Sequence, residues 1–201
     1  MSPTKVAPAA LALLLALALA VLSGCNESLK TDEQAMLDAY RQGQYDRALQ
    51  RGRSLSREAT GEVRTHAQYI AGVSAYRLGR DDEAIALLSP VSRSRQTDLA
   101  RSAQATLGLI HARRGNDELA LRYLTDVAHH LAGDDRGQVQ YHIGLIEQKM
   151  GRWDSARTHL SLALSYTSDP DLRHAIRHRM KTDAFALQFG AYSRIDLAQT
   201  K

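Results

Sequence analysis

Small and apolar residues recur every three or four positions along residues 31–168, the spacing that brings side chains to one face of an α-helix. A glycine returns every 36 residues within this pattern, and an alanine follows each glycine by five positions. A repeat of this length indicates a stacked array of structural units. The eight repeat-defining residues are Gly43, Ala48, Gly79, Ala84, Gly115, Ala120, Gly151 and Ala156.

Each unit is predicted to contain two helices joined by a tight turn. The glycine just past the first helix can adopt a left-handed backbone conformation that a Cβ atom would disfavour. The alanine on the second helix is small enough to let the two helix backbones approach closely. Pairs of helices are therefore expected at residues 32–57, 62–93, 97–131 and 136–166.

The repeated residues resemble the tetratricopeptide repeat (TPR) in three segments, AGVSAYRLGRDDEAIALL, TLGLIHARRGNDELALRYL and HIGLIEQKMGRWDSARTHL. The resemblance extends from about Leu29 to Tyr166. The consensus unit has about 34 residues, so each unit here has roughly two more in its connections. The resemblance implies an all-α fold: a right-handed α-solenoid of about four TPR helix pairs over residues 31–168, with a C-terminal capping helix and a short extended tail.

The first unit departs from the other three at two positions. Met36 stands where the later units carry glycine, and Gly52 stands where they carry leucine. We expect such departures in a terminal unit that caps an array.

Residues 169–183 are predicted to form the capping helix. Asp169 is suited to the N-cap and Pro170 to the first helical position. The segment is amphipathic, so it is expected to cover the apolar face that the fourth unit leaves open.

The segment at 184–201 changes character, because Phe185–Ser193 alternates in the manner of a short strand. It resembles the first strand of a SPOR domain, a family that binds peptidoglycan, and this resemblance implies that Gln188 contacts sugar. The sequence departs from the family at Ala191, where serine is frequent, and the resemblance ends at about Ala198. The segment is interpreted as part of a shortened SPOR protein, as a remnant lying on the repeats, or as a coincidence.

The first 24 residues have the features of a signal peptide: Lys5, then an apolar run from Ala9 to Leu22, then small residues. An uncleaved anchor is the alternative. Leu22-Ser23-Gly24-Cys25 resembles the bacterial lipobox, which implies that Cys25 is lipidated and that residues 25–30 form a lipidated linker. Asn26 after the cysteine favours the outer membrane, facing the periplasm, over the inner membrane. Cys25 is the only cysteine, so no disulfide framework is predicted.

Composition and motifs argue against several classes of function. Without Lys5, 25 Lys and Arg residues remain against 22 Asp and Glu, and this mild excess with no basic block does not indicate nucleic-acid binding. His174 and His178 lie one helical turn apart, but no third ligand or catalytic glutamate accompanies them. No phosphate loop, dinucleotide fingerprint or nucleophile elbow occurs, so we expect no metal, no cofactor, no small-molecule substrate and no catalysis.

The first helices of stacked repeats line a concave surface on which such proteins bind partners. Tyrosines there offer apolar area with a polar tip. The alternative is that the same side chains pack between neighbouring repeats. The predicted residues of this concave face are Tyr40, Tyr69, Tyr76, Leu109, Tyr141 and Leu145.

A basic residue lies two positions before each turn glycine. It either offsets the negative end of the helix dipole or attracts an acidic segment of a partner. The four residues are Arg41, Arg77, Arg113 and Lys149.

The sequence as a whole predicts a non-catalytic scaffold or adaptor. It would be lipid-anchored through Cys25 in the bacterial cell envelope, would hold another envelope protein on its concave face, and would contact peptidoglycan through Gln188. An assembly factor, resembling the TPR lipoproteins that help pilus secretins or outer-membrane barrels assemble, is the alternative. A cell-wall hydrolase or its accessory is a third hypothesis.

Overall fold

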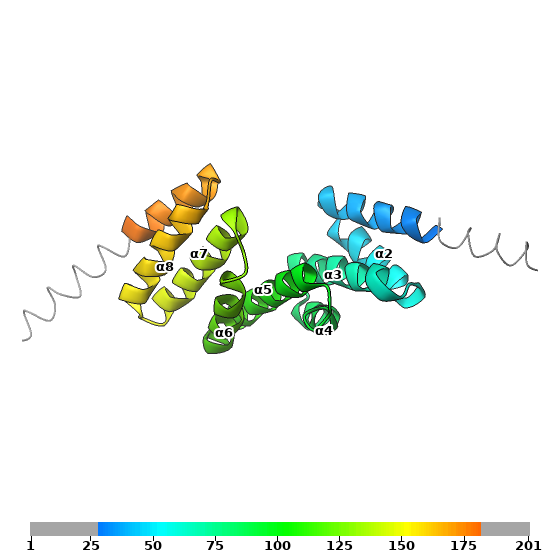
Figure 1. The fold of residues 1–201 in the computed structure, drawn as a ribbon, viewed down its shortest axis with the longest axis horizontal. Helices are drawn as coiled ribbons and strands as arrows, with labels where there is room; N and C mark the ends of the chain where they lie inside the picture. The colour runs from blue at the N-terminus through cyan, green and yellow to red at the C-terminus, as the bar shows by residue number, and fades with distance from the viewer. Residues whose placement is uncertain (1–27, 182–201) are drawn as a thin grey trace, which may run out of the picture. The chain divides into compact units, whose positions relative to one another are not determined.

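The structure is a computed structural model that describes residues 28–181, and these residues form helices and no strand. The chain divides into two compact units, Met1–Val91 and Ser92–Lys201, which are described separately below. Figure 1 shows the helices arranged as successive antiparallel pairs within each unit.

The N-terminal unit contains a helix at 28–41, then α2 (Tyr45–Glu58), α3 (Gly61–Arg77) and α4 (Asp81–Val91). Helix α3 packs against both α2 and α4. The core joins the first pair to α3 and consists of Met36, Ala39, Ala48, Leu55, Ala59, Ala67 and Ile70.

The C-terminal unit contains α5 (Thr97–Arg113), α6 (Asp117–Ala128), α7 (Gly133–Lys149), α8 (Trp153–Tyr166) and a helix at 170–181. Two apolar clusters hold it together. One lies between α6 and α7 and includes Leu121, Leu124, Val139, Ile143 and Ile146, and the other joins α8 to the last helix through Leu160, Ala163 and Ile176.

The four predicted helix pairs are present, with ends that differ by a few residues. In the first pair, residues 28–30, which the sequence assigned to a linker, are helical. The second pair ends at Val91 and the third at Ala128, each earlier than predicted. The fourth begins at Gly133, because a glycine with φ of 52° starts α7 after extended Ala132.

The repeat-defining residues have the predicted conformations. The four turn glycines have φ between 72° and 79°, in the left-handed region. Each donates its N–H to the carbonyl three residues earlier at 2.9–3.1 Å, and the next residue bonds to the carbonyl five earlier, as in a Schellman turn. The four alanines that follow are 0% exposed. The glycines therefore have the backbone conformation that the sequence predicted, and the alanines are buried.

Inside the second, third and fourth pairs a glycine on the first helix faces a leucine on the second. A Cβ atom added at Gly72 would come within 2.6 Å of the Leu88 side chain, and one added at Gly144 would come within 2.9 Å of that of Leu160. The same contact joins Gly108 to Leu124. The leucine thus occupies the space that the glycine leaves open.

In the first pair the large residue is on the first helix and the glycine is on the second. Met36 on the first helix is 0% exposed, and its Sδ lies 3.1 Å from the position that a Cβ on Gly52 would take. That Cβ would also lie 2.9 Å from the carbonyl oxygen of Ala67 on α3. The departures of the first unit from the others, which the sequence suggested were features of a terminal cap, therefore compensate each other within one pair.

The helix at 170–181 covers α8, the contact that a capping helix requires. The Asp169 carboxylate accepts hydrogen bonds from the N–H groups of Asp171 at 2.9 Å and Leu172 at 3.4 Å, as an N-cap does. Ile176 is 0% exposed and packs with Leu160 and Ala163 of α8.

Asp134 joins the start of α7 to the connection that follows α8. Its carboxylate accepts hydrogen bonds from the Ser168 N–H at 2.6 Å and from the Thr167 hydroxyl at 2.9 Å. These bonds, led by the one from the Ser168 backbone, lower the pKa of Asp134. The carboxylate therefore stays charged at neutral pH and fixes the chain between the fourth pair and the last helix.

Candidate protein-binding surfaces

The six residues predicted on the concave face lie on one face of the first helices. Within α3, for example, Tyr69 and Tyr76 are separated by seven positions, and Val73 lies between them with spacings of four and three. Residues at these spacings share a helix face. The corresponding triplets in the four first helices are Glu33, Leu37 and Tyr40; Tyr69, Val73 and Tyr76; Ala105, Leu109 and Ala112; and Tyr141, Leu145 and Gln148.

In the N-terminal unit the two triplets form an aromatic surface, here termed the N-terminal face. Leu37, Tyr40 and Tyr69 are half-buried and pack on the apolar core of the unit. The Tyr40 ring also meets the ring of Tyr45 edge-on at 5.7 Å. The three tyrosines of the triplets, Tyr40, Tyr69 and Tyr76, thus keep part of their surface accessible.

A polar contact fixes the two helices that carry the N-terminal face. The His66 ring Nδ1 lies 2.6 Å from the Glu33 carboxylate, which connects α3 to the helix at 28–41. The face is therefore held on two helices that are joined by both apolar and polar contacts.

In the C-terminal unit the two triplets form a second surface, here termed the C-terminal face. Ala105, Leu109 and Ala112 of α5 pack on the cluster between α6 and α7 and remain half-buried. Tyr141 of α7 packs on the cluster that includes the last helix, and Leu145 is half-buried. This face is more aliphatic than the N-terminal face and has a single tyrosine.

Four of the six predicted residues, Tyr40, Tyr69, Leu109 and Tyr141, contact core clusters. They therefore contribute to packing and also retain exposed surface, so the two interpretations made from sequence are compatible. The sequence interpretation missed Leu37, although shifting Leu109 back by two 36-residue repeats would have identified it.

Two of the four basic residues that precede the turn glycines form ion pairs nearby. Lys149 Nζ lies 2.9 Å from the Asp117 carboxylate at the start of α6, and Arg41 lies 3.6 Å from Asp38 on its own helix. For these two residues the contacts favour a structural role over recruitment of an acidic partner. Exposed ion pairs of this kind contribute about 0–1 kcal/mol each.

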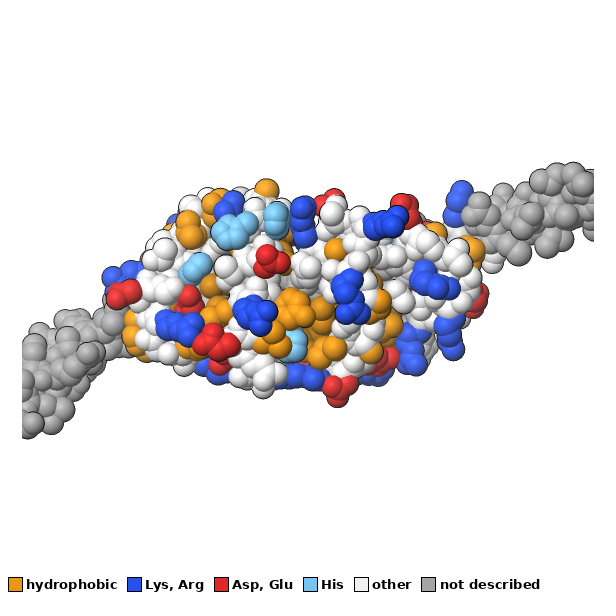
Figure 2. Space-filling view, turned by 60° about the horizontal axis from the view of Figure 1, so that its bottom comes forward, with side chains coloured by type: hydrophobic (Ala, Val, Ile, Leu, Met, Phe, Trp, Pro, Cys, Tyr) orange, Lys and Arg blue, Asp and Glu red, His pale blue; other side chains and the backbone are white. Residues whose placement is uncertain are grey.

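Two further ion pairs occupy equivalent positions in the two units. Arg80 pairs with Asp46 at 2.8 Å in the first unit, and Arg152 pairs with Glu118 at 2.5 Å in the second. Each joins the turn of one helix pair to the start of the second helix in the preceding pair. Lys and Arg side chains are spread over the face drawn in Figure 2 and do not gather into one block.

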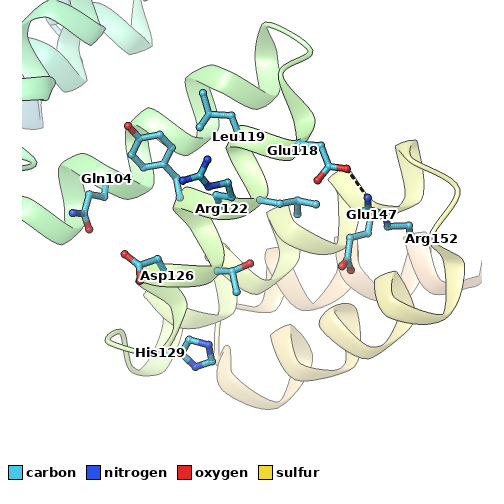
Figure 3. A pocket seen from close by; sticks show the side chains of 11 residues that line it. Gln104, Glu118, Leu119, Arg122, Asp126, His129, Glu147 and Arg152 are labelled. Carbon is cyan, nitrogen blue, oxygen red and sulfur yellow. Dashed lines mark hydrogen bonds and ion pairs between the residues drawn. The ribbon is translucent and has the colours of Figure 1, made fainter.

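An open groove of about 910 Å³ is lined mainly by residues of α6, together with Gln104 of α5 and Glu147 of α7. Figure 3 shows Arg122 and Asp126 of α6 along it, with the Glu118–Arg152 pair at one end. Because the groove is open and five of its eleven lining residues are charged, it lacks the apolar enclosure that small-molecule sites usually have.

A polar network lies beside this groove between α7 and α8. The Glu147 carboxylate, 7% exposed, accepts a hydrogen bond from the Ser155 hydroxyl at 2.6 Å and lies 3.8 Å from His159 Nε2. His159 Nδ1 lies 2.5 Å from the Gln140 side-chain oxygen. The network fastens the two helices of the fourth pair to each other.

Two histidines lie in partly buried packing environments. Burial, with the nearby Arg114 guanidinium, lowers the pKa of His111, whose ring stacks on Tyr123 at 5.6 Å. Burial also lowers the pKa of His142. Among residues 28–181, no group of three His, Cys, Asp or Glu side chains is placed to hold a metal ion.

Two predicted sites cannot be compared with the structure, because Cys25 and Gln188 lie outside the described residues. Within 28–181, none of the helices combines the length and apolar character needed to cross a membrane.

A family model matches residues 8–199: the N-terminal domain of EccA1, a protein of the ESX-1 type VII secretion system. No curated protein sequence matches the chain.

Solved structures with the same fold include MamA from Desulfovibrio magneticus, 18% identical, with 86% of this chain and 97% of that chain covered and a TM-score of 0.60. YrrB, described as a TPR protein with an unusual peptide-binding site, is 16% identical over 83% of this chain and 88% of its own, with a TM-score of 0.60. The TPR-like repeats of a putative kinesin light chain from Podospora anserina are 17% identical over 86% and 92%, with a TM-score of 0.62. These similarities show the fold, which is that of TPR solenoid proteins.

Proposed function

Because this chain belongs to the family of EccA1 N-terminal domains of the type VII secretion system, we propose that it is a non-catalytic adaptor of a secretion or envelope apparatus. TPR folds generally act as scaffolds that present extended surfaces to other proteins. The partners are proposed to be protein segments, which bind the N-terminal face of the first unit and the C-terminal face of the second.

The observation that carries this proposal is the set of half-buried tyrosines and aliphatic residues on the first helices of each unit. Tyrosine supplies apolar contact area and a hydroxyl that can bond to a peptide backbone. Residues spaced by three and four positions suit the apolar face of a helix or an extended segment. The peptide-binding site named for YrrB supports the same kind of ligand.

The location is proposed from sequence. Cys25 would carry the lipid that tethers the chain to the membrane of a bacterial envelope, with the outer membrane favoured, and Gln188 would contact peptidoglycan. The assembly of secretins or barrels remains the alternative role. We expect a fatty-acid probe to label the wild-type chain and not Cys25→Ala; equal labelling of both would contradict the anchor.

Replacing Tyr76 and Leu145 by alanine is expected to reduce recovery of the partner in a crosslinking pull-down by about tenfold or more, since well-placed aromatic and aliphatic anchors dominate interface energies. These two residues are chosen because Tyr141 packs on the last-helix cluster, so that its removal would also disturb the fold.

Trp153→Ala is the matched control, because Trp153 is a 36% exposed apolar side chain on a second helix, away from the proposed faces. Circular dichroism would verify that all variants remain folded. Unchanged recovery with the folded double variant would show that the first-helix faces are not the binding site.

A further inference from the structure

The last helix is placed on α8 as the first helix of a fifth pair would be. Ile176 and Met180 pack on the α8 cluster that includes Leu160. Val139 and Ile143, 37 residues earlier, pack in the same way on the cluster that includes Leu124 of α6. The helix at 170–181 therefore has the register of α7, shifted by 37 residues.

This helix is fixed in its orientation. The Nη1 group of Arg173 donates hydrogen bonds to the carbonyls of Leu164 and Thr167, both at 2.8 Å. Together with the Asp169 N-cap and the buried Ile176, this contact determines which side of the helix faces outward.

In α7, the residues that face its own second helix are known from their contacts. A Cβ on Gly137 would come within 2.9 Å of Thr167, one on Gly144 would come within 2.9 Å of Leu160, and the Gln140 side chain contacts His159. The surface defined by these three positions is where a second helix packs.

The last helix carries His174, Arg177 and Lys181 at the positions 37 residues later, and all three are exposed. We term this the cationic face. The surface that takes a second helix in the fourth pair is therefore presented to solvent in the last helix, and it carries basic side chains in place of glycines.

Helix dipole compensation accounts for only part of this charge. A cation near the last turn stabilises a helix, but Lys149 and Arg152 of the fourth pair are in addition paired with carboxylates of the preceding pair. In the last helix, the sole acidic residue is Asp171 in the first turn, and the following turns carry basic groups.

We propose that the cationic face docks an acidic helical segment of a partner protein. A helix fits because the equivalent surface of α7 is covered by a helix, and carboxylates at three- and four-residue spacing would meet His174, Arg177 and Lys181. A membrane surface fits less well, because the apolar stripe that would enter lipid is packed on α8. The chain's own residues 182–201 have two acidic and two basic residues and no net charge to match.

This surface is distinct from the N-terminal and C-terminal faces, so its test is independent of the proposed function. The probe is a fluorescent amphipathic helical peptide with glutamates at three- and four-residue spacing, measured by anisotropy against the full-length chain at low salt. The same peptide with glutamine for glutamate is the reference. We expect the acidic peptide to bind more tightly and its affinity to fall as salt rises.

The double variant Arg177→Glu/Lys181→Glu is expected to weaken acidic-peptide binding by about tenfold or more. Arg179→Glu, which makes one such charge change on another side of the same helix, should leave binding nearly unchanged. The proposal would be overturned by equal binding of the two peptides, by an equal loss with Arg179→Glu, by preference for anionic vesicles, or by self-association of the chain that the double variant abolishes.

Discussion

Leucine at position 52 is expected to destabilise the N-terminal unit by about 3 kcal/mol. Gly52 lies where even a Cβ would come within 2.9 Å of the Ala67 carbonyl oxygen and 3.1 Å of Met36 Sδ. A backbone oxygen cannot move away as a side chain can, so the larger residue must separate α2 from α3.

The reverse change, Met36→Gly, is expected to cost about 3–5 kcal/mol, because it leaves a cavity at a fully buried site and adds a glycine to a helix. If the two residues exchange volume, the double variant Met36→Gly/Gly52→Leu should be more stable than the sum of the single losses predicts. We expect the difference to be about 1–3 kcal/mol, because the removed methionine makes room for part of the leucine.

Hydrogen exchange of α2 and α3 amides gives the measurement for this unit. The only tryptophan, Trp153, lies in α8, so its fluorescence reports on the C-terminal unit and serves as the internal control. Strict additivity of the two single losses would show that Met36 and Gly52 do not compensate each other.

Ile176→Asp is expected to release the last helix from α8. Ile176 is 0% exposed among Leu160 and Ala163, and a carboxylate placed there would have no partner, which costs several kcal/mol. Because the lost contact is local, the helix should detach before the rest of the unit unfolds.

Limited trypsin digestion would detect the release through faster cleavage after Arg177 and Arg179. Uncovering Leu160 and Leu164 is also expected to promote self-association, visible by sedimentation. Arg179→Asp, the same new residue at an exposed position of that helix, should leave cleavage after Arg177 slow. Equal protection of the Ile176→Asp and Arg179→Asp chains would mean that this apolar contact does not hold the helix.

The helix pairs could be predicted from sequence because their signals are local. A glycine such as Gly79 needs only its own turn to require a left-handed conformation, and Ala84 needs only its own pair to require a small side chain. Helix ends were less accurate, because the start of α7 depends on Gly133, which is not one of the repeated turn glycines.

The relation between Met36 and Gly52 could not be predicted in this way. Each residue departs from the pattern when it is compared only with the residues at the equivalent position of the other units. Their compensation becomes visible when the facing positions of two helices are compared, as the contacts of Gly72 with Leu88 show for the next pair.

The residues predicted for the concave face do lie on the first helices, but sequence did not determine the division between packing and exposure. Tyr69 contacts the core and still keeps accessible area, a balance that depends on how neighbouring helices pack. His174 was considered in the sequence only as a metal ligand with His178, and the missing third ligand argued against that. Its register with Gly137, 37 residues earlier, becomes visible only when the last helix is compared with α7.

The exchanged pair in the first unit also constrains how this chain could have been assembled from copies of one ancestral module. Pairing the helix at 28–41 with the second helix of a later unit would place Met36 against a leucine. Pairing the first helix of a later unit with α2 would place a glycine against Gly52. Exchange of helices between units would thus produce either a steric clash or a cavity. The two helices of the first pair are therefore compatible with each other and not with the helices of later pairs. The same mismatch disfavours wrong pairing between similar helices while the chain folds.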